Sequence, residues 1–158
     1  MIKIGIDQLT LSDAEAVLFG GEKISIGGEP IERVRGSYEF LKKFSADKVI
    51  YGINTGFGPM AQYRINEKHQ LELQYNLIRS HCSGTGEKIP DIYVKAAMIT
   101  RLNTLMLGKS GVHPDLVKLL AELINRDIYP IIFEHGGVGA SGDLVQLAHL
   151  ALCLIAEG

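Results

Sequence analysis

The chain has 158 residues, of which 46% are hydrophobic and 22% are charged, and its formal net charge at pH 7 is -2. This composition excludes a disordered chain and favours one globular domain with a real core. The small net charge gives no electrostatic reason to expect a nucleic acid or an anionic membrane surface as partner.

The N-terminal quarter shows a helix, a strand and a second helix. Ser12 followed by Glu15 is the pattern of a capping box, which predicts a helix ending at the glycine pair of "LFGG". The alternating stretch "EKISIGG" predicts one short strand of a small hairpin or sheet edge. Residues 30–44 place apolar side chains at helical spacing and predict a helix.

A glycine-rich loop and a third helix follow. "DKVIYGINTGFGPMAQYRI" begins with a very short apolar run and continues as a loop. Asn66 is suited to cap a helix that runs to about residue 80. "SGTGEKIPD" indicates another break, after which Pro90 is well placed at a helix start.

Two helices are predicted between residues 91 and 130. The first covers about residues 91–107 and is ended by "GKSG". The second begins at His113-Pro114-Asp115 and is closed by Pro130. Its leucines and isoleucine fall on one predicted apolar face, formed by Leu116, Leu119, Leu120, Leu123 and Ile124.

The last predicted helix begins near Gly142 and is apolar on all sides except at Gln146 and His149. A helix of this kind is typical of the middle of a large bundle. Because the sequence stops at Gly158 with nothing afterwards to cover this helix, we expect the front portion of a longer protein. The alternative is that the earlier helices, or a second copy of the chain, bury it.

The fold class predicted from these patterns is mainly α, with small β elements and glycine-rich loops. The two cysteines, Cys82 and Cys153, are too few for a disulfide framework, which favours a reducing cytoplasm. The start "MIKIGIDQLT" lacks a signal-peptide pattern, and the longest apolar run, residues 150–156, is too short to span a bilayer. We therefore expect a cytoplasmic protein without membrane contact.

The tripeptide Ala140-Ser141-Gly142 can generate an electrophile from the chain itself. The backbone nitrogen of Gly142 can attack the carbonyl carbon of Ala140, because a residue without Cβ tolerates the approach. Loss of one water from the ring and one from Ser141 gives 4-methylidene-imidazol-5-one. Asp143 can assist as proton acceptor, and helix N-terminal amides can stabilise negative charge. The alternative interpretation is an ordinary helix N-cap.

Two further segments contain candidate groups. Tyr51 stands in "YGINTGFG" and can act as a general base if surrounding dipoles favour its phenolate form. The alternative is a half-buried tyrosine that ends a strand. Ser80-His81 lies at the end of a predicted helix, where a lone histidine is more often structural, and Cys82 is better interpreted as a small apolar residue than as a nucleophile.

Taken together, these segments resemble the aromatic amino acid ammonia-lyases, the family of histidine, tyrosine and phenylalanine ammonia-lyases and the related aminomutases. The resemblance rests on motifs in the family's order and spacing: "YGINTGFG", "NLIRSHCSGTG", "RLNTLMLGKSGV" and "GGVGASGDL". It runs through essentially the whole chain but covers only the N-terminal part of a family enzyme. Residues 1–158 would then be an N-terminal domain of the aspartase/fumarase-like helical fold.

The resemblance also implies a mechanism. Ala140-Ser141-Gly142 becomes the methylidene-imidazolone group, with Ser141 supplying the methylene carbon, and Tyr51 removes the β-proton of the substrate. Elimination of ammonia leaves an α,β-unsaturated acid, and no metal or nucleotide is needed. Family active sites draw on several subunits of a homotetramer. They also use residues beyond this chain's end to hold the substrate carboxylate, a role not assigned here to Arg64, Arg79 or Arg101.

For the substrate, the resemblance assigns Ser80, His81 and Gly58 to the binding site. The Ser-His pair is the pattern of histidine ammonia-lyases, and it also occurs in some bacterial tyrosine lyases and aminomutases. Gly136-Gly137 and Val145-Gln146 depart from the common histidine pattern and are similar to a tyrosine-type bacterial subgroup. The expected substrate is therefore L-histidine or L-tyrosine, giving urocanate or coumarate.

Three alternatives remain beside this hypothesis. A tyrosine aminomutase would use the same groups for a different outcome. A truncated, catalytically incomplete chain could serve only as an oligomerising module, with its tripeptide uncyclised. An ordinary helical domain that shares these loops by accident is the third.

Overall fold

The computed structural model describes residues 1–140, 142 and 144–158. The predicted fold class is confirmed, because helices dominate and the strands are short. In chain order the elements are β1 (Ile2–Lys3), α1 (Leu11–Leu18), β2 (Ile24–Ser25), α2 (Glu29–Phe44), the single-turn 3-10 helix η1 (Gly58–Met60), α3 (Glu67–His81), β3 (Thr85–Lys88), α4 (Asp91–Met106), α5 (Pro114–Asn125), β4 (Phe133–His135) and α6 (Leu144–Leu154).

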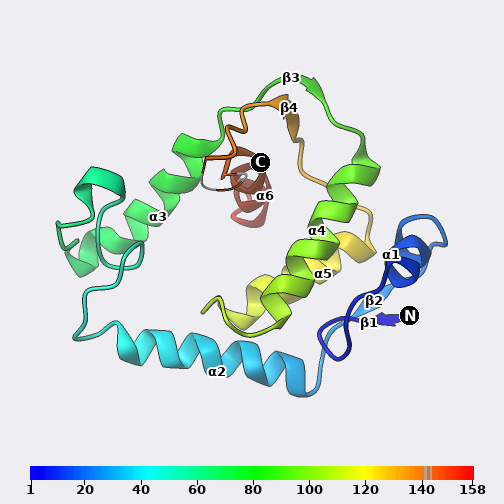
Figure 1. Ribbon diagram of the computed structural model, residues 1–158, viewed down its shortest axis with the longest axis horizontal. Helices are drawn as coiled ribbons and strands as arrows, with labels where there is room; N and C mark the ends of the chain where they lie inside the picture. Colours follow the sequence, from blue (N-terminus) through cyan, green and yellow to red (C-terminus); the bar gives the residue numbers. More distant parts are fainter. Residues whose placement is uncertain (141, 143) are drawn as a thin grey trace.

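The helices surround α6 on several sides (Figure 1). Helix α2 runs along one edge and joins the end that carries α1, β1 and β2 to the end that carries α3. Helix α6 lies between α3 and the α4–α5 pair and contacts both α3 and α5. The site described below is built where α3, α4 and α6 face one another.

The β structure consists of two small pairs. Strands β1 and β2 are parallel, with Ile2 opposite Ile24, and β3 and β4 are antiparallel, with Thr85 opposite His135. The strand predicted in "EKISIGG" is confirmed, but its partner is the N-terminal β1, so it does not form a hairpin. The β3–β4 pair joins the end of α3 to the segment that precedes α6.

The hydrophobic core is centred on α4 and α5. Fully buried side chains of these two helices pack against residues of the N-terminal elements: Val94, Met98, Ile99, Leu102, Met106, Val117, Leu120 and Ile124 with Ile4, Val17, Ile24 and Val34. The apolar face predicted for α5 is wrong at Leu119, which is 42% exposed. Val117 and Ala121 are buried instead, because positions 117, 120, 121 and 124 share one side of a 3.6-residue helix.

The capping predictions are confirmed for α3 and corrected for α1. The amide of Lys68 donates to Asn66 Oδ1 at 3.1 Å, as a cap requires. Helix α1 begins after Thr10, whose Oγ1 accepts from the Asp13 amide at 3.1 Å while the Thr10 amide donates to Asp13 Oδ2 at 3.0 Å. The capping box therefore uses Thr10 and Asp13, and Ser12 lies inside the helix.

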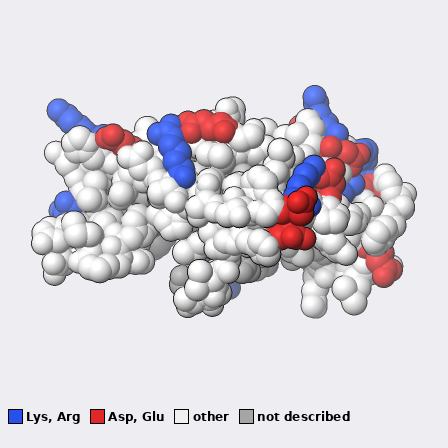
Figure 2. Space-filling view, turned by 90° about the horizontal axis from the view of Figure 1, so that it is seen from above, with Lys and Arg blue, Asp and Glu red and all other residues white. Residues whose placement is uncertain are grey.

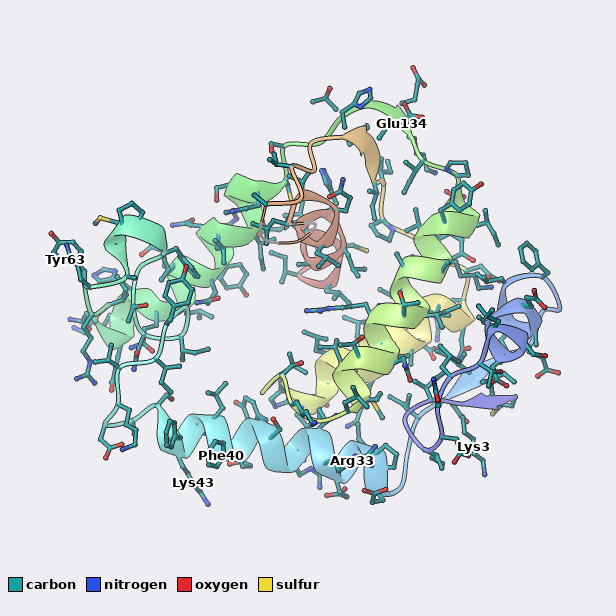
Figure 3. The ribbon with its side chains drawn as sticks, viewed as in Figure 1. Lys3, Arg33, Phe40, Lys43, Tyr63 and Glu134 are labelled. Atoms are coloured by element: carbon teal, nitrogen blue, oxygen red, sulfur yellow. The ribbon has the colours of Figure 1, made fainter. Side chains whose placement is uncertain are left out.

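Arg33 fixes α2 to its neighbours. Its Nη2 donates to the carbonyl of Gly5 at 2.6 Å and to that of Met106 at 3.4 Å, so one side chain joins the segment after β1, α2 and the end of α4. Figure 3 shows Arg33 at the α4–α5 end of α2, while Phe40 and Lys43 point outward from the other half. This arrangement sets the direction in which α2 leads the chain toward Tyr51.

The surface is mixed in charge, and α6 is incompletely covered. On the face in Figure 2, acidic and basic side chains lie in small neighbouring groups. Leu144 and Leu147 of α6 are 48% and 37% exposed, so the earlier helices cover only part of this apolar helix. Within residues 1–140, 142 and 144–158, no helix combines the length and the hydropathy required to cross a bilayer.

Candidate active site

Two cavities meet at His81. The larger, about 540 Å³, lies among α3, α4, α6 and the loop that precedes α3, and its lining comprises Tyr51, Phe57, Leu77, Ile78, His81, Arg101, Leu144, Leu147 and Ala148. The smaller, about 180 Å³, is lined by His81, Leu144, Val145, Ala140, Gly142 and residues 136–139. His81 and Leu144 therefore border both the space beside Tyr51 and the space beside the tripeptide.

The loop that carries Tyr51 is ordered by two buried polar residues. Asn54 is 2% exposed, and its side chain accepts from the Ile50 amide at 2.8 Å and donates to the carbonyls of Lys48 at 2.7 Å and Ser45 at 3.1 Å. Thr55 Oγ1 accepts from the Gly52 amide at 3.2 Å. These bonds satisfy backbone groups that have no strand or helix to pair with.

Tyr51 lies in this turn and is 64% exposed, so the alternative of a half-buried tyrosine ending a strand is wrong. Its ring packs edge-to-face against Phe57, with centroids 5.9 Å apart and planes at 82°. The amide of Gly58 donates to the phenol oxygen at 3.3 Å. A donated hydrogen bond stabilises negative charge on that oxygen, as a proton acceptor requires.

His81 is the last residue of α3, and its ring orientation follows from its contacts. His81 Nδ1 lies 2.8 Å from the carbonyl oxygen of Leu77, which can only accept, so Nδ1 carries the proton. In the neutral ring, Nε2 is then left as an acceptor. Ser80 Oγ donates to the same carbonyl at 3.1 Å and lies 3.2 Å from His81 Nδ1. Ser80 lines neither of the two cavities.

Of the tripeptide, Ala140 and Gly142 are described, whereas Ser141 and Asp143 lie outside the described residues. Gly142 has φ +103°, a region that side-chain-bearing residues rarely adopt. A Cβ added there would meet nothing within 4 Å. Glycine is therefore required at position 142 by the backbone conformation and not by crowding.

The remaining predicted groups contribute differently. Gly58, assigned to substrate binding from the sequence, lines neither cavity and contacts the phenol oxygen of Tyr51. Burial raises the pKa of the thiols of Cys82 and Cys153, which keeps them in the weakly nucleophilic protonated form. Among the described residues, no three histidine, cysteine or carboxylate side chains are grouped so that they could hold a metal ion.

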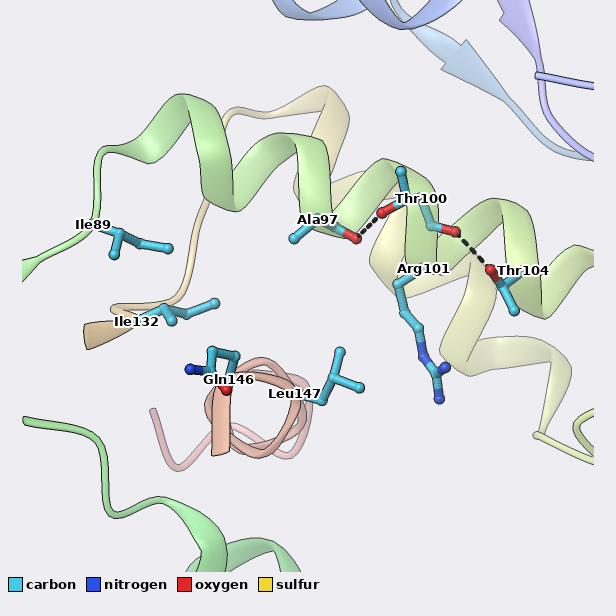
Figure 4. Close-up of a pocket in the computed structure, with 8 residues that line it drawn as sticks. All are labelled: Ile89, Ala97, Thr100, Arg101, Thr104, Ile132, Gln146 and Leu147. Carbon is cyan, nitrogen blue, oxygen red and sulfur yellow. Dashed lines mark hydrogen bonds between the residues drawn. The ribbon is translucent and has the colours of Figure 1, made fainter. Parts of the chain in front are cut away.

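A neighbouring cavity of about 440 Å³ shares Arg101 and Leu147 with the larger one (Figure 4). Its two threonine hydroxyls donate within α4, from Thr100 to the Ala97 carbonyl at 2.9 Å and from Thr104 to the Thr100 carbonyl at 3.0 Å. Its other polar side chains are Arg101 and Gln146, whose Oε1 is buried and accepts no hydrogen bond from a described residue.

Sequence reasoning did not identify Phe57, Asn54 or Arg101 as parts of the site. Phe57 and Asn54 stand inside the "YGINTGFG" motif, and a polar residue between glycines was a usable signal for a side chain that organises a loop. Arg101 lies on α4, about fifty residues along the chain from Tyr51, and only the packing of α4 beside α6 brings it to the cavity. Periodicity does not encode that packing.

The sequence is similar to proteins of a known family. The family model described as "Aromatic amino acid lyase" matches residues 9–158. A probable histidine ammonia-lyase of Thermoplasma acidophilum is 42% identical over 159 residues, covering 100% of this chain and 32% of that protein. The tyrosine 2,3-aminomutase of Chondromyces crocatus is 45% identical over 158 residues, covering 99% of this chain and 30% of that protein.

The fold is also similar to that of a solved structure. The crystal structure of a tyrosine aminomutase from Streptomyces globisporus matches with a TM-score of 0.91 at 34% sequence identity, covering 99% of this chain and 30% of that chain. The chain spans about a third of the length of the curated relatives it matches.

Proposed function

This chain belongs to the aromatic amino acid lyase family, and from that premise we propose that it supplies the general base and the electrophile-forming tripeptide of an enzyme that breaks the carbon–nitrogen bond of an aromatic α-amino acid. The observation that carries the proposal is the meeting of two cavities at His81, one lined by Tyr51 and the other by Ala140 and Gly142.

In this proposal Tyr51 takes the β-proton of the substrate. The Gly58 amide holds the phenol oxygen and stabilises the charge that the oxygen bears in the reactive form. The edge-to-face contact with Phe57 restricts the ring so that its oxygen keeps one direction. These two contacts come from residues six and seven positions after the tyrosine, so the loop itself positions the base.

Ala140, Ser141 and Gly142 form the methylidene-imidazolone group, and Asp143 assists ring closure as a proton acceptor. That group supplies an electrophile which makes the substrate's ammonium a better leaving group. Helix α6 begins at Leu144, two positions after Gly142, and the amides of its first turn favour negative charge close to the tripeptide. Gly142 provides the backbone freedom that the closure requires.

The lining of the larger cavity suits an aromatic side chain. Five of its residues are aliphatic: Leu77, Ile78, Leu144, Leu147 and Ala148. An apolar lining favours contact with an aromatic ring, with a few polar groups left to set its orientation. His81 is the polar group at the junction of the two cavities, and we assign it, with Ser80 behind it, to recognition of the substrate side chain.

The acceptor nitrogen of His81 is compatible with two substrates. With Nδ1 bonded to Leu77, Nε2 can accept from the phenol of L-tyrosine or from the imidazole N–H of L-histidine. We therefore propose ammonia elimination from L-histidine or L-tyrosine, giving urocanate or coumarate. The groups that hold the substrate carboxylate are proposed to come from residues outside this chain, in a cytoplasmic homo-oligomer.

A second candidate is an aminomutase, which is favoured by the 45% identity to a tyrosine 2,3-aminomutase and by the match to a tyrosine aminomutase structure. Such an enzyme would keep the released ammonia and return it to the neighbouring carbon. The residues of this chain would have the same roles in both reactions.

The test is to incubate the assembled protein with L-histidine and L-tyrosine in separate reactions and to analyse the products. Free ammonia with urocanate or coumarate supports the lyase, and a β-amino acid supports the aminomutase. A protein that turns over neither substrate, nor L-phenylalanine, would contradict the proposed activity and favour an oligomerising module.

A further inference from the structure

His149, in the middle of α6, contacts the start of the β3–β4 pair. Its Nε2 accepts a hydrogen bond from the amide of Gly84 at 3.2 Å. Its ring also packs edge-to-face against Phe133 of β4, with centroids 5.6 Å apart and planes at 71°. One side chain of the helix that follows the tripeptide thus contacts the strand that precedes it and the segment that leaves α3.

Gly84 has room for no side chain at this contact. A Cβ added to Gly84 would lie 2.8 Å from His149 Nε2 and 3.3 Å from Phe133 Cβ. The backbone of Gly84 therefore reaches the ring directly, and its amide points at the nitrogen. Because the amide donates, that nitrogen is unprotonated and the neutral ring carries its proton on Nδ1.

The loop that carries the tripeptide begins at the same place. Gly136 follows β4 directly, and a Cβ there would lie 2.8 Å from Val145 Cγ1 and 3.2 Å from Gly84 Cα. The backbone of Gly136 therefore packs closely between Gly84 and the first turn of α6, with no space for a side chain. The loop leaves β4 at this point, so the position of its first residue depends on how Gly84 and α6 are held together.

We propose that His149 is a positioning residue that seats this loop by holding Gly84 against α6 through a neutral Nε2 acceptor. His149 lines neither of the two cavities that meet at His81, so it acts through the backbone and does not touch the substrate. Its effect on ring closure at Ala140-Ser141-Gly142 rests on the proposed function, whereas its effect on the position of Gly136 against α6 does not.

The test is nuclear magnetic resonance of the uniformly labelled chain. In the unchanged protein we expect the Nδ1-protonated tautomer of His149 and a proton–proton contact between Gly136 Hα and the Val145 methyl group. His149→Leu, which keeps an apolar side chain and removes the acceptor, should weaken that contact. In Gly84→Ala the added methyl group would clash with the His149 ring, so this variant should weaken the Gly136–Val145 contact as well.

A rescue variant distinguishes loss of the hydrogen bond from loss of packing at position 149. The side-chain oxygen of His149→Gln can replace Nε2 as acceptor and should restore the contact. His69→Leu is the matched control, because His69 is an exposed α3 histidine whose ring hydrogen-bonds to Glu72 and to no other described residue. Resonances of the α4–α5 core report whether each variant is folded.

The outcomes are distinct. An Nε2-protonated tautomer in the unchanged chain overturns the inference without any variant. A Gly136–Val145 contact that survives in both His149→Leu and Gly84→Ala also overturns it. Where the parent tripeptide has lost two waters, the rate of water loss should fall about twofold to tenfold in His149→Leu, because one hydrogen bond changes the population of the correctly positioned loop by about that factor. A parent peptide that loses no water contradicts the proposed function and leaves the positioning result standing.

Discussion

At the scale of single residues, the position of Tyr51 is decided by its immediate neighbours in the chain. Asn54 and Thr55 shape the turn, Phe57 packs against the ring, and Gly58 donates to the phenol oxygen. The ring can therefore stay in place when its oxygen is removed, so the chemical role of the hydroxyl can be tested without disturbing the fold.

Tyr51→Phe should lower turnover by about 100-fold to 10,000-fold, the usual contribution of a positioned general base. Its melting temperature should change little, because a ring of nearly the same volume keeps the Phe57 contact. Steady-state kinetics and thermal unfolding measure the two effects. Tyr63→Phe, an exposed tyrosine of the same loop region, is the control. Equal turnover in Tyr51→Phe and Tyr63→Phe would remove Tyr51 from the mechanism.

Ser141→Ala should abolish turnover and leave secondary structure unchanged, because it deletes only the hydroxyl whose loss creates the methylene carbon. Circular dichroism and product formation measure these results. Ser83→Ala, an exposed serine close to His81 in the sequence, should keep full activity. Sustained turnover in Ser141→Ala would contradict the assigned role.

Residue types alone left Tyr51, His81 and the tripeptide with ordinary structural alternatives, and it was the family resemblance of the motifs that made them candidates. Neither the residue types nor the motifs were enough to predict which groups contact these residues. The contact of the Gly58 amide with Tyr51 was not predicted, because an amide at φ +53° is directed by loop geometry that a motif does not state. His149 was noted only as an interruption of an apolar helix, and its partner Gly84 is about 65 positions away.

At the scale of elements, β2 is secured by a side chain and not only by its partner strand. Asn125, the last residue of α5, accepts from the Ile24 amide at 2.8 Å and donates to the Ile24 carbonyl at 2.9 Å. It thus pairs with one edge of β2 while β1 pairs with the other. Two residues of strand would be marginal without this support.

Asn125→Ala should lower the free energy of unfolding by about 1–3 kcal/mol, because both backbone groups of Ile24 lose a partner. Chemical denaturation measures the change. Asn103→Ala, at an α4 asparagine whose side chain makes no hydrogen bond with any described residue, should cost less. A loss no larger than that of Asn103→Ala would show that β2 does not depend on Asn125.

The turn after α5 contains a pH-dependent contact. Lys95 Nζ donates to Asp127 Oδ1 at 2.7 Å, and the Tyr129 hydroxyl donates to the same oxygen at 2.5 Å. These bonds, the one from Lys95 foremost, lower the pKa of Asp127 from 3.8 to about 2. The folded state therefore binds the proton less readily than the unfolded chain. The stabilisation is complete above pH 3.8 and is lost as pH falls through 2.

Asp127→Asn should accordingly destabilise the protein at neutral pH, and its deficit should shrink as pH falls from 4 toward 2. Asparagine tolerates the φ of +56° at this position, so the change removes charge without adding backbone strain. Urea unfolding at several pH values measures the deficit. Asp47→Asn is the control, because that carboxylate makes no ion pair with a described residue. A deficit that does not vary with pH would refute the ion-pair account.

Element boundaries were largely predictable, because caps and prolines mark them locally. Helices α2, α3, α4 and α5 begin and end close to the residues that the pattern indicates. The strands β3 and β4 were not predicted, since "SGTGEKIPD" carries break signals and its pairing partner lies some fifty residues away. The capping box of α1 was placed two residues late because Thr10 and Ser12 both have an acidic residue three positions on.

At the scale of the whole molecule, α4 organises both the core and the site. One face packs into the core through side chains such as Met98 and Leu102, and Arg101 on another face lines the larger cavity. Helix α6 lies across from it, between α4 and α3 (Figure 1). This three-dimensional arrangement could not be derived from periodicity, which reports one helix at a time.

Leu102→Ala should cost about 2–5 kcal/mol of unfolding free energy, because Leu102 is fully buried and the space cannot close completely. Leu119→Ala on the exposed side of α5 should cost far less. Denaturant titration of the two variants provides the comparison. Equal losses would mean that the core is not centred where the α4–α5 contact places it.

The family resemblance stated from motifs is confirmed by the family model over residues 9–158 and by the similar fold of a tyrosine aminomutase. Ring closure at Ala140-Ser141-Gly142 remains the central proposal, and the mass of the proteolytic peptide that contains it is the most direct test. In protein that turns over substrate, we predict a peptide lighter by two water molecules than its encoded sequence. A peptide at its full encoded mass in the same active preparation would contradict the account.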